Sequence, residues 1–262
     1  MFPSLPVHER LLLTASTALL LLAVLAPPMA QPPHLHDFAD QRLLWGVPCA
    51  LDVLSNLAFA AAGVLGMLAL RHVPAARLAS AQGACARLFF VGLLVTAGGS
   101  TWYHVAPNDA GLAVDRAAMA VTFAGLLGLL GATRVSARAG LALAAAMLVL
   151  APASVWAWCA TGNVMPWAVV QFGGIALILL VLAFTRPQAG ALPVRWMLVL
   201  AAYAAAKMLE VNDHLIYEAS GQLLSGHTLK HVFAALAAWP VIAAVAGRAH
   251  RQNALKPAAR IT

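Results

Sequence analysis

Long apolar runs separated by short loops are the feature that most constrains this chain. Eight of them can be read, at roughly 10–29, 51–70, 88–106, 111–131, 139–158, 165–185, 193–213 and 227–247. Each approaches the about 20 apolar residues that an α-helix needs to cross the hydrocarbon core of a bilayer. The runs are rich in Leu and Ala and lack the period-2 alternation of strands, so they indicate helices. Because the chain is 62% hydrophobic and only 10% charged, we expect an all-α, polytopic membrane protein.

The first run has two interpretations. It begins near His8 and Arg10 and ends in a small-residue stretch at 28–30, which is typical of a secretory signal peptide. The apolar stretch is also nearly long enough to span, and we favour an extra N-terminal helix. Seven core helices remain in either case. The expected organisation is an N-terminal hydrophobic segment at 1–30, a seven-helix membrane domain at 31–250 and a basic cytoplasmic tail at 251–262.

The sign of the charge alternates from loop to loop. Basic residues follow every second run, at Arg71, Arg77, Arg87, Arg134, Arg138, Arg186, Arg195, Arg248, Arg251, Lys256 and Arg260. Acidic residues gather in and beside the other loops, at Asp37, Asp40, Asp52, Asp109, Asp115, Glu210, Asp213 and Glu218. This positive-inside pattern predicts a cytoplasmic C-terminus and acidic loops on the outer face. The net charge of +7 is then a topology signal, and we expect no nucleic-acid partner.

Histidines occur at the predicted outer ends of two core helices. The third run ends with Ser100 and His104, and the last run opens with His227 and His231. Each pair is four residues apart, so its two side chains share one helix face. Taken singly, such residues are also compatible with helix-end groups that face solvent. Ionisable residues at membrane depth are costly and usually functional, however, and the predicted topology brings all three histidines to one layer.

Three histidines in one layer can supply three nitrogen ligands for a zinc ion and leave the fourth position open to water. Catalytic zinc has this arrangement, whereas structural zinc is normally closed by four protein ligands. We therefore predict a zinc ion bound by His104, His227 and His231 near the outer face of the membrane.

Acidic residues provide two further predictions. Asp115 follows a short outer loop and comes near the level of His104, although an acid in the first helical turn also favours the helix dipole. Asp37, Asp40 and Asp52 precede or open the second run, where three acids could bind a hard cation such as calcium through oxygen ligands. A solvated acidic loop is the alternative for those three.

A polar cluster ends the seventh run. It contains Lys207, Glu210, Asp213 and His214, and its first two members are three apart and could pair on one helix face. We interpret the cluster as a structural polar network, with a role near the substrate as the alternative.

These residues together resemble the alkaline ceramidase family, and more broadly the membrane-hydrolase superfamily that includes the adiponectin and progestin receptors. The resemblance rests on Ser100-x-x-x-His104, on Asp115 eleven residues later in the next helix, and on His227-x-x-x-His231 at the start of the last helix. It covers the seven-helix core. It implies that the three histidines bind zinc, that Ser100 and Asp115 are catalytic, and that the N-terminus of the core lies outside.

The resulting functional expectation is a zinc-dependent hydrolase that cleaves the amide bond of ceramide or a related N-acyl lipid within the membrane. A zinc-stabilised lipid receptor or sensor with little hydrolysis is the alternative. A transporter would need ionisable residues through the whole bilayer depth, but the inner halves of the helices are almost wholly apolar. The Ala- and Arg-rich, Lys-poor composition favours a bacterial inner membrane, which would place the zinc site near the periplasmic face.

Overall fold

A computed structural model describes residues 5–78 and 80–254 of the chain. In this part the chain forms helices joined by connections that are short except at 26–49 and 185–195, with two isolated backbone bridges and no strand. The expected all-α fold is therefore confirmed. The last helix ends at Ala254, and residues 255–262 of the expected basic tail lie outside the described part.

Seven helical segments are long and apolar enough to cross a membrane, which confirms a multi-pass architecture. Three of them are interrupted helices. The segments are α1 (Val7–Leu25), α2 with α3 (Ala50–Ser55 and Leu57–Arg71), α5 (Ala81–Val105), α6 (Asp109–Arg134), α7 (Ala137–Thr161), α8 with the π-helical turn η1 and α9 (Met165–Ala168, Val169–Gly173 and Gly174–Phe184), and α12 with α13 (Gly226–Leu236 and Trp239–Ala254).

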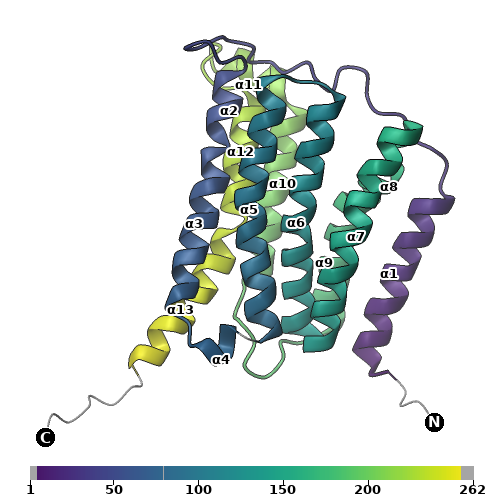
Figure 1. Cartoon of the computed structure of the whole chain (residues 1–262), viewed down its shortest axis with the longest axis vertical. Coiled ribbons are helices and arrows are strands. Elements are labelled where there is room, and N and C mark those ends of the chain that lie inside the picture. The colour runs from purple at the N-terminus through teal and green to yellow at the C-terminus, as the bar shows by residue number, and fades with distance from the viewer. Residues whose placement is uncertain (1–4, 79, 255–262) are drawn as a thin grey trace, which may run out of the picture.

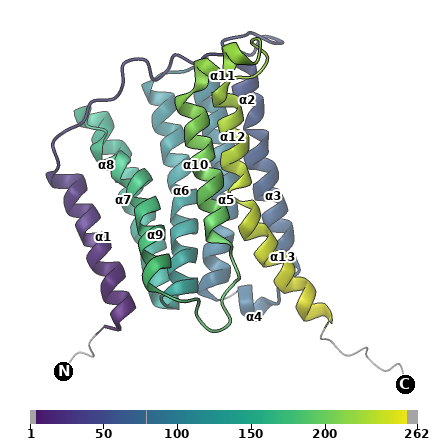
Figure 2. The same ribbon diagram turned by 180° about the vertical axis from the view of Figure 1, so that it is seen from behind.

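The apolar run predicted at 193–213 forms a shorter helix than expected. Helix α10 covers Trp196–Val211, which is 16 residues, and the segment before it, which contains Pro193, is not helical. At Asn212 the chain turns into the short helix α11 (Asp213–Ala219). A helix of this length spans about 24 Å, less than the about 30 Å hydrocarbon core. It nevertheless lies within the bundle, against α12 (Figure 2).

Helix α5 lies at the centre of the bundle and packs against α3, α6 and α7 (Figure 1). Small residues allow the close approach of α5 and α6. A Cβ atom on Gly125 of α6 would lie 2.2 Å from the backbone nitrogen of Phe89 in α5, so only glycine fits there. This close packing fixes the two helices that carry the candidate catalytic residues relative to each other.

Helix α1 stands at the edge of the bundle, beside α8, η1 and α9 (Figures 1 and 2). Glu9 in its first turn pairs with Arg138 and accepts a hydrogen bond from Ser136, which ties α1 to the start of α7. The N-terminal run is therefore a helix that belongs to the bundle.

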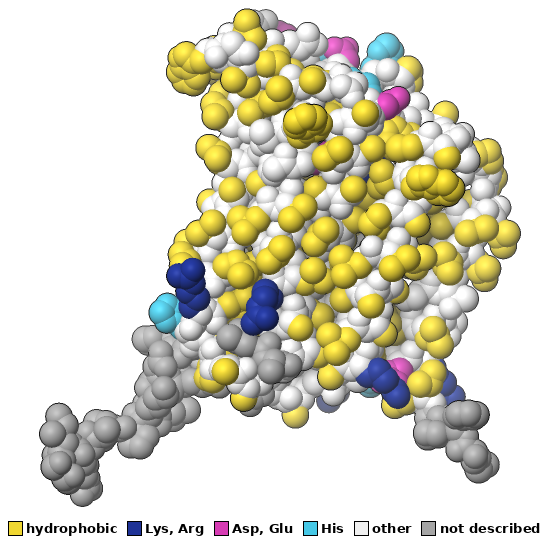
Figure 3. All heavy atoms as spheres, viewed as in Figure 1, with side chains coloured by type: hydrophobic (Ala, Val, Ile, Leu, Met, Phe, Trp, Pro, Cys, Tyr) yellow, Lys and Arg dark blue, Asp and Glu magenta, His cyan; other side chains and the backbone are white. Residues whose placement is uncertain are grey.

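The two ends of the bundle differ in charge. On the face shown in Figure 3, Lys and Arg side chains lie toward the end where α1 begins, and acidic side chains appear at the opposite end. The belt between them is dominated by hydrophobic side chains, as a lipid-facing surface requires. The short helices α4 (Ala75–Leu78) and α11 lie at opposite ends (Figure 1).

Candidate metal centre

The three predicted histidines meet in the structure. His104 is on the last turn of α5, and His227 and His231 are on the first two turns of α12. One ring nitrogen from each lies within 4.8 Å of the others. All three residues are buried, with exposed fractions of 0%, 7% and 2%. The predicted grouping of these three histidines is therefore present in the structure.

The nitrogen geometry fits a zinc ion. The Nε2 atoms of His104 and His227 are 3.3 Å apart. Two nitrogens bound to zinc at about 2.05 Å with a tetrahedral angle would be about 3.3 Å apart. The Nε2 atom of His231 is buried and has no hydrogen-bond partner. A buried polar atom is rarely left without a partner. A metal ion bound among the three rings would supply the missing partner of this nitrogen.

Ser55 determines the orientation of the His231 ring. Its hydroxyl donates to the backbone oxygen of Asp52 at 2.9 Å, and its oxygen lies 2.7 Å from Nδ1 of His231. Since the single hydroxyl proton is used in the first bond, Nδ1 must donate to Ser55. The lone pair of His231 is then on Nε2, which is the nitrogen that faces the other two histidines.

The first turn of α12 is held by hydrogen bonds from other segments. Ser225 is the N-cap and accepts from the backbone N–H of Thr228 at 2.9 Å. The carboxylate of Asp213 accepts from the backbone N–H of His227 at 2.7 Å, and that of Asp52 accepts from the Thr228 hydroxyl at 2.6 Å. These bonds satisfy groups that a helix start leaves free, and they fix the position of both histidines on α12.

The ring of Phe38, in the loop before α2, covers the histidines. Its centroid is 4.7 Å from that of His104 and 4.5 Å from that of His227. The same loop is tied down by His36, whose ring bonds the Tyr103 hydroxyl at 2.8 Å and Asp109 at 3.0 Å. The cluster is therefore shielded on its loop side.

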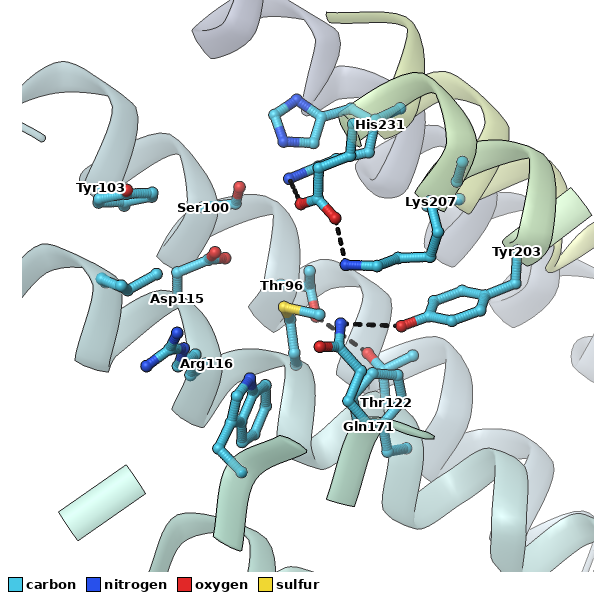
Figure 4. A pocket seen from close by; sticks show the side chains of 18 of the residues that line it. Thr96, Ser100, Tyr103, Asp115, Arg116, Thr122, Gln171, Tyr203, Lys207 and His231 are labelled. Carbon is cyan, nitrogen blue, oxygen red and sulfur yellow. Dashed lines mark hydrogen bonds and ion pairs between the residues drawn. The ribbon is translucent and has the colours of Figure 1, made fainter. Parts of the chain in front are cut away.

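Ser100 and Asp115, which the resemblance implies are catalytic, share a cavity with the two histidines of α12. Both line a cavity of about 380 Å³ that also reaches His227 and His231. Figure 4 shows their side chains on neighbouring helices, directed toward the same part of this cavity. Both residues are buried, and Oδ1 of Asp115 has no hydrogen-bond partner. A carboxylate with a free oxygen is therefore available to a ligand.

The rest of the cavity is mostly apolar and extends down between the helices. Its deeper wall carries two neutral polar pairs, Thr96 with Thr122 at 2.9 Å and Gln171 with Tyr203 at 2.9 Å (Figure 4). The remaining deep lining is largely aromatic and aliphatic, including Phe89 and Leu93. Such a space suits a hydrocarbon chain whose polar end lies at the histidines.

The predicted pairing of Lys207 and Glu210 is confirmed, and a second lysine joins it. Glu210 pairs with Lys207 and with Lys230, the latter at 3.1 Å. The ammonium of Lys230 also lies 2.9 Å from Nε2 of His227. Sequence reasoning assigned no role to Lys230, although its position three residues after His227 places it on the same side of α12.

The three acids considered for calcium have separate protein partners. Asp37 accepts from Gln41, Asp40 pairs with Arg42, and Asp52 accepts from Ser225 and Thr228. Among the described residues, one cluster of three potential metal ligands is found, and it consists of His104, His227 and His231. Calcium stays a prediction that no observation here supports.

The positive charge beside Asp40 comes from Arg42, which forms an ion pair with it. Burial alone would raise the pKa of the Asp40 carboxyl, but the hydrogen bonds and charge of Arg42 outweigh burial and hold that pKa below its ordinary value. Arg42 also donates to the backbone oxygen of Leu223 at 3.0 Å. The ion pair therefore joins the loop before α2 to the loop before α12.

No protein-family model matches this chain, and no curated protein matches it significantly. The functional interpretation therefore depends on the site itself.

Proposed function

We propose that this protein is a zinc-dependent intramembrane hydrolase, similar to alkaline ceramidases, that cleaves the amide bond of ceramide or a related N-acyl lipid. The observation that carries the proposal is the position of three buried histidine nitrogens at one end of an apolar cavity that also contains Ser100 and Asp115. A metal centre of neutral histidines beside a free carboxylate is an arrangement suited to hydrolysis.

The protein residues divide the chemistry between them. A zinc ion held by His104, His227 and His231 would supply Lewis acidity and lower the pKa of bound water to about 7. Asp115 would accept a proton from the attacking water through its unpartnered Oδ1 and later deliver it to the leaving amine. Ser100 would donate a hydrogen bond to the oxygen that becomes negative. Removing one such donor typically reduces kcat by about 100- to 1000-fold.

The substrate class follows from the position of the cavity. Its charged groups lie near the end of α10 and the starts of α6 and α12, beside the acidic loops, and its deeper part is lined by aromatic and aliphatic side chains with two neutral polar pairs. A membrane lipid with its acyl chain in the deep part would present its amide carbonyl at the histidines. By the positive-inside pattern this end would be the outer face, which in a bacterial inner membrane is the periplasmic face.

Metal analysis and a lipid-amide assay on the purified protein test this proposal. We expect about one zinc per chain and release of fatty acid from N-acyl sphingosine or a related amide, detected by mass spectrometry. Asp115→Ala should retain zinc but lose turnover, because Asp115 is not one of the three residues that would hold the ion. His231→Ala should lose both. Stoichiometric zinc and lipid binding without release from any amide would favour the receptor or sensor, and a protein without zinc would contradict both.

A further inference from the structure

Arg116 is a buried cation that the proposed reaction does not use. It follows Asp115 on α6 and lines the same cavity (Figure 4). Only 8% of its surface is exposed, and its Nη1 atom is buried without a hydrogen-bond partner. Its guanidinium lies over the rings of Trp158 and Trp167, with distances of 4.3 and 5.8 Å from Cζ to the ring centroids. The two indoles hold the cation in place but accept no conventional hydrogen bond from it.

No described carboxylate forms an ion pair with Arg116. Asp115 is its neighbour in sequence, but the two side chains point in different directions from α6 (Figure 4). Glu210, the other acid that lines the cavity, is already shared by Lys207 and Lys230. The side chains of opposite charge that line the cavity are thus unequal in number, with three cations (Arg116, Lys207 and Lys230) and two carboxylates (Asp115 and Glu210).

A buried cation without an anionic partner is costly, and the cost is higher in a membrane-spanning segment than in a soluble protein. Such residues in membrane proteins commonly mark a ligand path. An arginine presents several N–H donors in a plane, which matches the oxygens of a carboxylate or a phosphate. Arg116 is therefore suited to bind an anion that comes from a ligand.

We propose that Arg116 binds an anionic headgroup, so that the substrate is an N-acyl lipid with a carboxylate or phosphate close to the amide bond. This inference rests on the proposed function, because it assigns a headgroup to the lipid that the cavity would hold. The geometry favours a short headgroup. Arg116 is one residue from Asp115 and lies against Trp158 of α7 and Trp167 of α8, and Trp167 also lines the cavity. The anion would occupy that side while the amide carbonyl lies at the histidines.

Binding of three lipids that differ only in the headgroup tests the proposal. N-oleoylglycine carries a carboxylate, N-oleoyl phosphoethanolamine carries a phosphate, and N-oleoylethanolamine is neutral and of similar length. Their dissociation constants would be measured on the purified zinc-loaded protein in neutral detergent. We expect at least one anionic lipid to bind about 10- to 100-fold more tightly than the neutral one, as is usual for a charge-assisted bidentate contact. The two anionic lipids distinguish a carboxylate ligand from a phosphate ligand.

Arg116→Gln should abolish this preference, so that the anionic lipids bind no more tightly than N-oleoylethanolamine. Arg116→Lys, which keeps the charge but loses the planar donors, should show an intermediate preference. Arg195→Gln removes an exposed cation at the start of α10, the opposite end of that helix from Glu210, and is the matched control. Zinc content and thermal stability verify that each variant is folded. If Arg116→Gln does not fold, Arg116→Lys replaces it in this comparison, because Lys207 and Lys230 also line the cavity and only a variant at position 116 assigns the preference to Arg116.

Equal affinity of the wild-type protein for the three lipids would overturn the inference, and so would an anionic preference that survives in Arg116→Gln. A hydrolysis assay with the same lipids distinguishes failure of this inference from failure of the proposed hydrolase function. Turnover of the neutral lipid without an anionic preference would contradict the role of Arg116 and retain the hydrolase. An anionic preference in binding without turnover of any lipid would retain the role of Arg116 and contradict the hydrolase.

Discussion

The hydroxyl oxygen of Ser55 lies 2.7 Å from Nδ1 of His231, although the two residues are 176 positions apart in the chain. Ser55→Ala would remove the acceptor for the Nδ1 proton, so that the His231 ring could rotate and change tautomer. We expect zinc affinity to fall by about 10- to 100-fold, as for other residues that orient metal ligands. Competition with a chromogenic chelator would measure it. Ser55→Thr keeps the hydroxyl and should bind zinc normally, whereas unchanged affinity in Ser55→Ala would contradict the assigned role.

Zinc removal should destabilise the fold, because His104, His227 and His231 join two helices that are distant in sequence. A ligand present at about 1,000 times its Kd stabilises by about 4 kcal/mol. For a chain of this size we expect a strong chelator to lower Tm on the order of 5–15 °C. Scanning fluorimetry in detergent would show it. His231→Ala should have a low Tm that the chelator does not change, and a chelator-insensitive wild type would argue against a resident ion.

Much of the fold could be predicted from the sequence because hydropathy reports directly on lipid exposure. The limits of the helices were harder. Residues 193–195 lie before the first turn of α10, and the turn at Asn212 ends that helix, so the apolar run at 193–213 gave a helix of only 16 residues. A hydropathy window averages over such local breaks. The break between α2 and α3 at Asn56, whose side chain bonds the Asp52 carbonyl, was hidden for the same reason.

The candidate site, like the fold, could be predicted from the sequence only in part. The positions of His227 and His231 on one helix face follow from local periodicity, and the loop charges brought His104 to the same end. The partners of these residues could not be predicted, because contacts such as those of Ser55 and Phe38 depend on how distant segments pack. One-dimensional spacing carries no information about such contacts.

Gly226 lies directly before His227, and its position leaves no space for a side chain. A Cβ atom there would lie 2.2 Å from the backbone oxygen of Leu209 and 2.7 Å from Cα of Asp213. Gly226→Ala would therefore push the start of α12 away from α10 and α11. We expect a loss of about 1–3 kcal/mol in stability, measured by thermal unfolding, together with reduced zinc content.

Gly98 provides the matched control for that substitution. It lies on α5, the helix that carries His104, and nothing would be within 4 Å of an added Cβ. Gly98→Ala should therefore be neutral or stabilising by up to about 1 kcal/mol, since alanine favours helices more than glycine does. Equal effects of the two substitutions would show that the packing at Gly226 is not important.

The native cysteines offer a test of membrane orientation. Cys159 is exposed near the end of α7 that adjoins the acidic loops, whereas Cys49 and Cys85 are buried. Burial, together with Asp52 and Asp40, raises the pKa of the Cys49 thiol to about 11, so this thiol is unreactive at neutral pH. In intact bacterial cells, a membrane-impermeant maleimide should label Cys159 from outside if the positive-inside orientation holds. Cys159→Ser is the negative control, and adding Ala189→Cys, in the loop at the opposite end, should restore labelling only after lysis.

The ion pair of Asp40 and Arg42 should make the fold sensitive to acid. Because Arg42 holds the pKa of the buried Asp40 carboxyl below its ordinary value, folding favours the ionised form. This contribution is fully present above the pKa of the unfolded chain, about 3.9, and is lost as the pH falls through the lower folded value. Asp40→Asn should therefore be less stable than wild type at pH 7, and the difference in Tm should shrink as the pH falls below about 4. The difference between the two proteins is the informative quantity, because protonation of the histidines affects both alike. A constant difference in Tm from pH 7 to pH 3 would show that Asp40 does not stabilise the loop through its charge.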